Sequence, residues 1–179
     1  MSAKTIYYTA TSLDGFIADD RDSLAWLFAQ DQDEQGPLNY DEFRANLGAG
    51  CMGATTYEWV LDHEDEWSWT LPMWVFTHRD LPPNKGVTFV RDDVRTVHQQ
   101  MLEAAGGKDL WVVGGGDLAG QFADAGLLDE VITYVAPVTL GAGRPLLPRR
   151  LDLRLESTER NRDFITARFS VVGPGGWTD

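Results

Sequence analysis

The sequence predicts a single α/β domain, residues 1–179, with a mostly parallel central sheet flanked by helices and an antiparallel C-terminal edge. Three observations lead to this fold class. Strand-like runs alternate with helical patterns through the first three quarters of the chain, as in sheets whose parallel strands are joined by helices. Residues 110–113 form the continuous apolar run of a strand buried on both faces. Two strand-like segments, residues 151–155 and 164–172, then follow one another at the end of the chain.

The N-terminal elements follow from β-branched and apolar runs. Residues 6–11 are β-branched and aromatic and predict the first strand, and residues 16–18 become apolar again after a turn. Residues 40–47 predict a short helix that Gly48 closes, and a short strand follows at residues 51–52. The chain is therefore expected to return to the sheet after one short helix.

The middle of the chain continues the alternation. We expect a helix at residues 56–61, a loop, and strands at residues 73–77 and 87–90. Asp92 or Asp93 can cap the next helix, which two glycines end. One face of that helix is apolar and consists of Val94, Val97, Met101 and Ala105.

The last quarter begins with the buried strand at residues 110–113. Three glycines follow it and open a short helix in which Leu118 and Phe122 lie one turn apart and which Gly126 ends. Residues 131–138 then predict a long strand. The two closing segments have no helix between them, so we expect them to pair as an antiparallel hairpin.

Composition and charge exclude several classes of protein. The formal net charge of −13 and the sequence pI near 4.5 oppose binding to nucleic acid or to anionic membranes, and no basic run offsets them. No run of 18 apolar residues predicts a membrane span, and the N-terminus has no apolar signal core. We therefore expect a cytoplasmic protein.

Cysteine and histidine usage argues against a disulfide or a metal site. The single cysteine, Cys51, excludes an internal disulfide and argues against a cysteine-based zinc site. The acidic run at residues 62–66 contains His63 but lacks the helical HExxH spacing, so we interpret it as a solvated loop. No metal is expected.

A run of three glycines, Gly114 to Gly116, ends a buried strand and opens a helix. Such a run lets the backbone approach a pyrophosphate, and the helix dipole favours its negative charge. The alternative is a tight turn with Asp117 as the helix cap. We favour phosphate binding, because three glycines exceed what a turn needs. Tyr134 stands where a Rossmann unit would place an acid, so that fold is not expected.

A second helix start follows Gly53, in the segment Met-Gly-Ala-Thr-Thr-Tyr-Glu at residues 52–58. Thr55 and Glu58 have the spacing of a capping box, which predicts the helix start. A helix that begins after a glycine also offers a second phosphate cradle. Two cradles suit the two ends of a dinucleotide better than a mononucleotide.

Four segments, in order along nearly the whole chain, resemble the dihydrofolate reductase-like superfamily. They are residues 9–18, 52–58, 74–79 and 112–118. Residues 12–15 (Ser-Leu-Asp-Gly) and 140–148 (Leu-Gly-Ala-Gly-Arg-Pro-Leu-Leu-Pro) are typical of the branch that contains the reductase domain of the bifunctional riboflavin-biosynthesis deaminase-reductase. The zinc deaminase domain of that enzyme is absent here, so the resemblance implies a free-standing reductase.

This resemblance implies that NADPH binds across the carboxyl ends of the central strands. Asp14, after the first strand, would lie near the nicotinamide and the substrate as the catalytic residue; otherwise it is the first residue of an Asp-Gly turn. Three groups of residues would bind the cofactor: Gly53, Ala54, Thr55 and Thr56 at its phosphates, Thr77, His78 and Arg79 at the adenosine 2′-phosphate, and Gly114, Gly115, Gly116, Asp117 and Leu118 on the pyrophosphate and nicotinamide side.

The implied substrate is a small nitrogen heterocycle, with 5-amino-6-(5-phosphoribosylamino)uracil as the first candidate. Ala54 stands where the family usually has a basic residue, which leaves the preference for NADP over NAD open. Dihydrofolate or dihydropteridine reduction is the alternative, although no nearby acid matches the pterin-binding position; the acids considered are Asp31, Asp33, Glu34, Asp41 and Glu42. A non-catalytic NADPH-binding module is the alternative from another class.

Two further expectations concern surfaces. The tryptophans Trp26, Trp59, Trp67 and Trp69 belong to the core or form an apolar lid over a flat heteroaromatic substrate. A homodimer is expected, because the branch commonly forms one and because the chain has a long apolar strand at residues 131–138 beside an antiparallel edge.

Overall fold

The computed structural model describes residues 2–177 and contains ten strands and five helices within that range. The strands are β1 (Thr5–Thr11), β2 (Phe16–Ala18), β3 (Leu47–Gly53), β4 (Met73–Phe76), β5 (Val87–Val90), β6 (Asp109–Gly114), β7 (Glu130–Val135), β8 (Arg144–Pro145), β9 (Leu151–Asn161) and β10 (Phe164–Pro174). The helices are α1 (Ala25–Phe28), α2 (Tyr40–Ala45), α3 (Ala54–His63), α4 (Val94–Ala105) and α5 (Gly116–Asp124).

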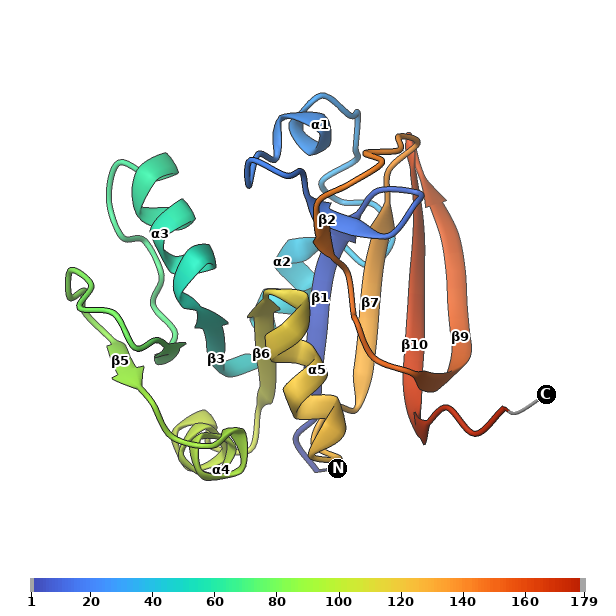
Figure 1. The fold of residues 1–179 in the computed structure, drawn as a ribbon. Coiled ribbons are helices and arrows are strands. Elements are labelled where there is room, and N and C mark those ends of the chain that lie inside the picture. The colour runs from blue at the N-terminus through green and yellow to red at the C-terminus, as the bar shows by residue number, and fades with distance from the viewer. Residues whose placement is uncertain (1, 178–179) are drawn as a thin grey trace.

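Eight strands form one mixed sheet in the order β5-β4-β3-β6-β1-β7-β10-β9 (Figure 1). The strands from β5 to β7 pair in parallel, whereas β10 pairs antiparallel with β7 and with β9. The hairpin β9–β10 therefore forms the antiparallel edge. This arrangement confirms the predicted fold class, a dihydrofolate reductase-like mixed sheet that is mostly parallel.

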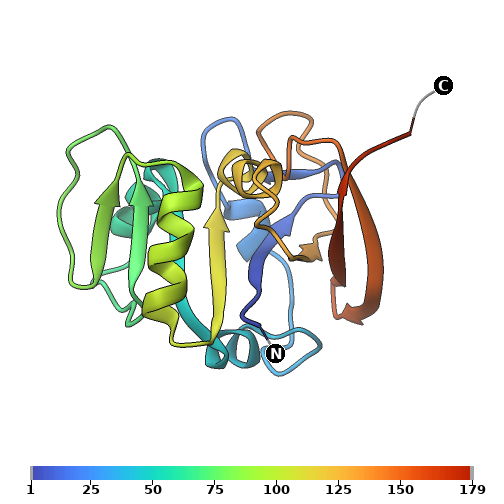
Figure 2. The same cartoon turned by 90° about the horizontal axis from the view of Figure 1, so that it is seen from below.

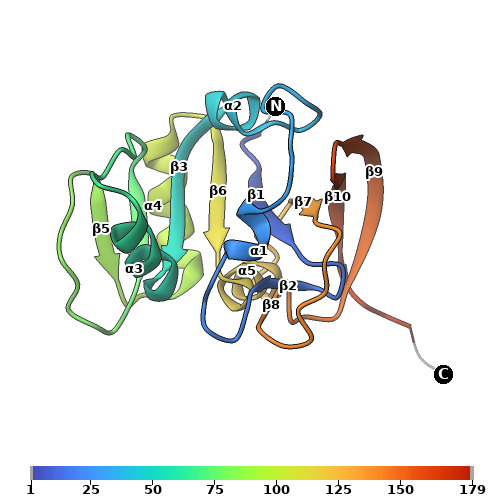
Figure 3. The ribbon, with the colours of Figure 1, turned by 90° about the horizontal axis from the view of Figure 1, so that it is seen from above.

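Helices cover both faces of the sheet, as the views from below and from above show (Figures 2 and 3). Successive residues of a strand point to opposite faces, and the core follows this alternation. Tyr7 and Cys51 pack in the cluster that includes α4 and α5. Their neighbours Tyr8 and Met52 pack on the other face, with residues from α1 and from α3 respectively. The strands thus read as continuous apolar runs because both faces are buried.

Helix α4 has the ends that the sequence predicts. The Asp93 side chain accepts a hydrogen bond from the backbone N–H of Arg95, which satisfies one of the free donors of the first turn. Gly106 follows the helix in the left-handed conformation (φ 59°). The predicted apolar face is buried. Sequence signals at both ends and on the face agree here, and the prediction is confirmed.

Two predicted details are wrong. Gly48 does not close the helix before it: α2 ends at Ala45, and Gly48 lies in β3, where a Cβ would come within 2.4 Å of the Ala105 carbonyl oxygen. Close packing of α4 on β3 therefore requires this glycine. The capping box at Thr55 does not form, because α3 begins at Ala54, two residues earlier than predicted, with Gly53 as its N-cap and Thr55 inside the helix.

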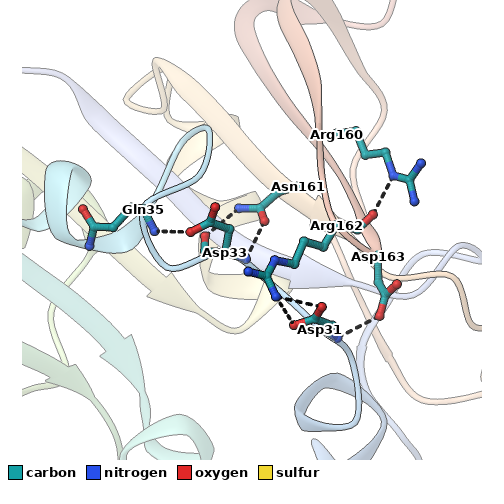
Figure 4. A network of polar contacts seen from close by, with 7 residues as sticks. All are labelled: Asp31, Asp33, Gln35, Arg160, Asn161, Arg162 and Asp163. Atoms are coloured by element: carbon teal, nitrogen blue, oxygen red, sulfur yellow. Dashed lines mark hydrogen bonds and ion pairs between the residues drawn. The ribbon is translucent and has the colours of Figure 1, made fainter.

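The loop after α1 is fastened to the tip of the β9–β10 hairpin (Figure 4). The backbone N–H groups of Asp31 and Asp33 donate to the side chains of Asp163 (2.8 Å) and Asn161 (2.7 Å). Asn161 in turn donates to the Asp33 carbonyl oxygen (3.0 Å), and Arg162 pairs with the Asp31 carboxylate (2.9 Å). Both acids therefore hold chain segments together.

His98 on α4 makes a testable contribution to pH stability. Its Nε2 lies 2.9 Å from the Thr5 hydroxyl, its Nδ1 is buried without a partner among residues 2–177, and burial lowers the pKa of the imidazole. The unfolded chain takes up a proton near pH 6.5 and the folded chain only at lower pH. We therefore expect stability to be full above pH 6.5 and to fall as the pH drops below it. Thermal unfolding between pH 7.5 and 5.5 should show a smaller decline for His98→Gln; an equal decline would contradict this.

Candidate active site

A cavity of about 770 Å³ opens at the carboxyl ends of the parallel strands. Its walls include Thr9 of β1, Phe76 at the end of β4, and Gly53 and Gly114, which end β3 and β6. Helices α3 and α5 begin at this edge. Open α/β sheets bind ligands in the crevice outside these strand ends, so the fold places a ligand site here.

The two glycine-led helix starts border the same cavity. Gly53 and Gly115 occupy the N-cap positions of α3 and α5, and no side chain caps either helix. The N–H groups of both first turns are therefore free to meet an anionic ligand, which the helix dipoles favour. The predicted cofactor-binding residues that line the cavity are Gly53, Ala54, Thr55, Thr56, Arg79, Gly114, Gly115, Gly116, Asp117 and Leu118. Their binding of a cofactor stays a prediction.

Gly115 and Gly116 differ in the space around them. A Cβ on Gly115 would have Ile17 Cδ1 at 3.8 Å as its nearest neighbour outside the adjoining residues, which is ordinary contact. A Cβ on Gly116 would lie 2.2 Å from the Pro145 carbonyl oxygen and 2.4 Å from that of Leu146. Gly116 is therefore needed for packing, whereas the space beside Gly115 is left to the cavity.

The segment after β4 contributes one residue, Arg79, to the cavity lining, and neighbouring side chains hold Arg79 in place. Arg79 lines the cavity and forms an ion pair with Glu58 of α3 at 2.6 Å. The Thr77 hydroxyl oxygen accepts the backbone N–H of Arg79 (2.9 Å) and so fixes the turn. Thr77 is buried and His78 is exposed, and neither lines the cavity. Of the three residues predicted in this segment, Arg79 alone lines the cavity.

Asp14 also lies outside the cavity lining. Its carboxylate accepts the hydroxyl of Ser12 (2.6 Å) and the backbone N–H groups of Leu140 (3.0 Å) and Gly141 (2.8 Å). These hydrogen bonds, that of Ser12 first, lower the pKa of Asp14, so the carboxylate has no proton to donate at neutral pH. This geometry ties the turn after β1 to the loop that leads to Arg144. The catalytic role stays a prediction without geometric support.

Asp14→Asn distinguishes a catalytic role of Asp14 from a structural one. The amide has one acceptor oxygen in place of two, so we expect a less firmly held loop at residues 140–141 and a lower melting temperature at pH 7. Turnover should stay within about tenfold of the wild type, since no proton transfer is removed. A loss of about 100-fold or more in kcat at unchanged melting temperature would instead identify general acid or base catalysis.

Charged pairs brace the rim. Arg144 donates through Nε and Nη2 to the two carboxylate oxygens of Asp22 at 2.6 and 3.0 Å, which lowers the pKa of Asp22. Arg149 pairs with Asp117 (3.0 Å) and with Asp124 (2.7 Å). Hydrogen bonds from Gln121 and Arg149 lower the pKa of Asp117, so this acid stays ionised in the first turn of α5.

Aromatic residues form part of the cavity wall. Trp59, Trp69 and Trp111 line it, and the Trp69 and Trp111 rings stack at 5.3 Å with an interplanar angle of 7°. Trp67 packs on Trp69, and Trp26 packs in the core cluster near α1. The predicted tryptophan set is thus divided between cavity wall and core.

Sequence reasoning missed several lining residues, namely Asp22, Glu64, Trp111, Gln121, Arg144, Pro145 and Pro148. For three of these a signal existed, because the segment at residues 140–148 was singled out as typical of the family branch without any role. Trp111 sits in the middle of β6 and gave no signal, since a strand aromatic is ordinarily core.

None of the acids considered for pterin binding lines the cavity; these are Asp31, Asp33, Glu34, Asp41 and Glu42. Asp31 and Asp33 are engaged with the β9–β10 hairpin, and Asp41 and Glu42 start helix α2. Within residues 2–177 no three His, Cys, Asp or Glu side chains gather as a metal site, and no helix there is long and apolar enough to cross a membrane.

The fold and cavity define an α/β protein of the dihydrofolate reductase-like class, with two helix starts facing one ligand site. Residues 60–163 match the family model of the RibD C-terminal domain, and the chain belongs to that family. The protein YwjB of Bacillus subtilis, described as uncharacterized, is 32% identical over 170 residues, which cover 89% of this chain and 93% of YwjB.

Solved structures agree with this assignment. A protein of Shewanella sp. PV-4, provisionally named a riboflavin biosynthesis protein, is 25% identical with a TM-score of 0.80, over 96% of this chain and 99% of that one. The diaminohydroxyphosphoribosylaminopyrimidine deaminase/5-amino-6-(5-phosphoribosylamino)uracil reductase of Thermotoga maritima has a TM-score of 0.63 at 16% identity. The match covers 95% of this chain but 57% of the Thermotoga protein, and it shows the shared fold alone.

Proposed function

We propose that this protein is an NADPH-dependent reductase of a small nitrogen heterocycle of the pyrimidine type. The observation that carries the proposal is one cavity bordered by two uncapped, glycine-led helix starts and by an aromatic wall. The two helix starts suit the phosphates of a dinucleotide, and the aromatic wall suits a flat ring. Membership of the RibD C-terminal domain family supports a riboflavin-pathway type of reductase.

The residues present fit the cofactor. The first turns of α3 and α5 would hold its phosphates, the open space beside Gly115 admits the pyrophosphate, and Arg79 would meet the 2′-phosphate. When bound, NADPH supplies the hydride. The chain itself binds and orients both partners and excludes water with Trp59, Trp69 and the β2–β8 ribbon, at whose ends Ala18 and Arg144 lie.

A cofactor titration and a turnover assay test the proposal together. NADPH binding is measured by quenching of tryptophan fluorescence, and NADPH oxidation is followed with a panel of pyrimidines and pteridines. We expect binding together with turnover of a pyrimidine. Tight binding without turnover of any compound would favour the non-catalytic module, turnover of dihydrofolate would favour the other alternative, and no binding would contradict the proposal.

We further propose a homodimer that uses the β9–β10 edge. These two strands expose Leu153, Leu155, Ile165 and Val172, and the outer strand β9 has unpaired backbone groups along its free side. We expect light scattering to give about twice the chain mass of 20.0 kDa and Leu155→Glu to give a folded monomer. A monomeric wild type would contradict this, and Leu13→Glu, at an exposed leucine outside β9 and β10, is the control.

A further inference from the structure

Resting on the reductase function proposed above, we propose that the substrate is a flat nitrogen heterocycle without a phosphate group, bound against the aromatic wall of the cavity with N–H donors facing Glu64. Such a compound differs from the phosphoribosyl compound in the name of the Thermotoga relative. The charges around the cavity, the position of Glu64 and the aromatic wall carry the proposal.

Both bases that line the cavity within residues 2–177 are already paired with acids. Arg79, beside α3, pairs with Glu58. Arg144 is the base left for a substrate, and its guanidinium donates to both oxygens of Asp22. A bidentate pair of this kind is among the stronger side-chain interactions. The pair with Asp22 uses two of the five N–H donors of Arg144, and the carboxylate neutralises the charge that would otherwise attract a substrate phosphate.

The lining acids outnumber the lining bases. They are Asp22, Glu64 and Asp117, against two arginines. Asp22 is paired with Arg144, and Asp117 with Arg149, which Asp124 shares, whereas Glu64 has no ion pair within the described range. A phosphate dianion near this carboxylate would be repelled, while an uncharged or cationic ring would not.

Glu64 lies at the C-terminal end of α3, where a carboxylate destabilises the helix. It is the C-cap residue of α3, and the negative end of a helix dipole opposes an acid there. Its oxygens accept the Trp69 indole N–H at 3.2 Å and the Ser68 hydroxyl at 3.3 Å, both long contacts. A carboxylate has about four acceptor positions, so Glu64 keeps acceptors for the N–H groups of a ring.

The aromatic wall next to Glu64 suits a flat ring. Trp69 and Trp111 stack nearly parallel, and Trp59 adds a third indole to the lining. Trp69 both belongs to this wall and donates to Glu64, so the apolar surface and the acceptor are adjacent. Sites for heteroaromatic ligands combine a mostly apolar wall with a few placed polar groups in this way.

The alternative arrangement is a substrate whose phosphate binds to Arg44. Arg44 lines a neighbouring cavity of about 160 Å³ that shares Glu64, Trp69 and Trp111 with the large one, and it has no ion pair within the described range. A phosphate bound to Arg44 would lie in a cavity that the Glu64 carboxylate also borders. We therefore favour the compound without phosphate, and Arg44→Gln tests the other arrangement.

The direct test compares two compounds that differ by one group, 5-amino-6-ribosylaminouracil and its 5′-phosphate. Their dissociation constants are measured by calorimetry with NADP⁺ bound, after cofactor binding has been shown separately. We expect the compound without phosphate to bind at least about tenfold tighter, a difference of about 1.4 kcal/mol. Tighter binding of the phosphate, or of neither compound, would overturn the proposal. Failure of the cofactor to bind would instead overturn the proposed function.

Two substitutions test which residues cause the preference for the compound without phosphate. Asp22→Asn releases Arg144, so we expect the 5′-phosphate to gain about tenfold or more in affinity, with Asp20→Asn, at an exposed neighbour, as the control. Glu64→Gln should weaken the compound without phosphate by about tenfold or more, with Glu66→Gln as the control. An unchanged affinity in Glu64→Gln, or loss of phosphate binding in Arg44→Gln, would overturn the arrangement.

Discussion

Gly115→Val is expected to give a folded protein that no longer binds NADPH. Gly115 has φ −78° and ψ −173°, which any residue adopts, and a Cβ there meets Ile17 Cδ1 at 3.8 Å. The melting temperature should therefore change by no more than about 1–2 °C. The valine methyl groups would occupy the space beside the start of α5 that the pyrophosphate needs. Fluorescence titration should show no binding at NADPH concentrations that saturate the wild type.

Gly116→Ala is the matched control, because a side chain at this adjacent glycine should lower the stability of the fold, whereas one at Gly115 should not. Its Cβ would overlap two backbone carbonyl oxygens, Pro145 O at 2.2 Å and Leu146 O at 2.4 Å. Such overpacking costs about 1–3 kcal/mol, so the melting temperature should fall by several degrees, about 2–4 °C per kcal/mol. Normal NADPH affinity in folded Gly115→Val would show that the glycine run is a tight turn and does not bind the pyrophosphate.

Most of the fold could be predicted because its signals are local. The apolar face of α4, its Asp93 cap and its terminal glycine all lie in one continuous segment, residues 93–106, and the buried strand β6 reads directly as an apolar run. Errors arose where tertiary packing decided. Gly48 looks like a helix terminator, yet it is required by the backbone of α4, which is distant in sequence. The full length of β9, to Asn161, was missed because its residues are mostly exposed and polar.

The site could be predicted in part for the same reason. Glycine-led helix starts are local patterns, and both line the cavity. The pairs Arg144–Asp22 and Glu64–Trp69 join residues whose proximity depends on the folded chain, the first across more than a hundred positions. Asp14 was singled out for its place after β1, but which way its carboxylate points is decided by the backbone of Leu140 and Gly141.

Arg79→Ala is expected to weaken NADPH binding by about 10- to 150-fold and to leave NADH binding unchanged. Arg79 lines the cavity beside α3, where we propose that the cofactor binds, and a charge-assisted contact with the 2′-phosphate is worth about 1.5–3 kcal/mol. Separate titrations with the two cofactors measure the difference. His78→Ala, at an exposed neighbour outside the lining, is the control. Equal losses for both cofactors would show that Arg79 supports the fold instead.

Glu58→Gln should act in the opposite direction, because Glu58 competes with the 2′-phosphate for Arg79. The two side chains are paired at 2.6 Å and both are substantially exposed, so breaking the pair costs little, within about 0.2–1 kcal/mol. Removing the negative charge should raise the affinity for NADPH by up to about fivefold and leave NADH unchanged. The double variant should bind NADPH as weakly as Arg79→Ala alone, because the gain acts through the guanidinium. A gain that persisted without Arg79 would mean that Glu58 repels the cofactor directly, and the ion pair would then have no part in cofactor choice.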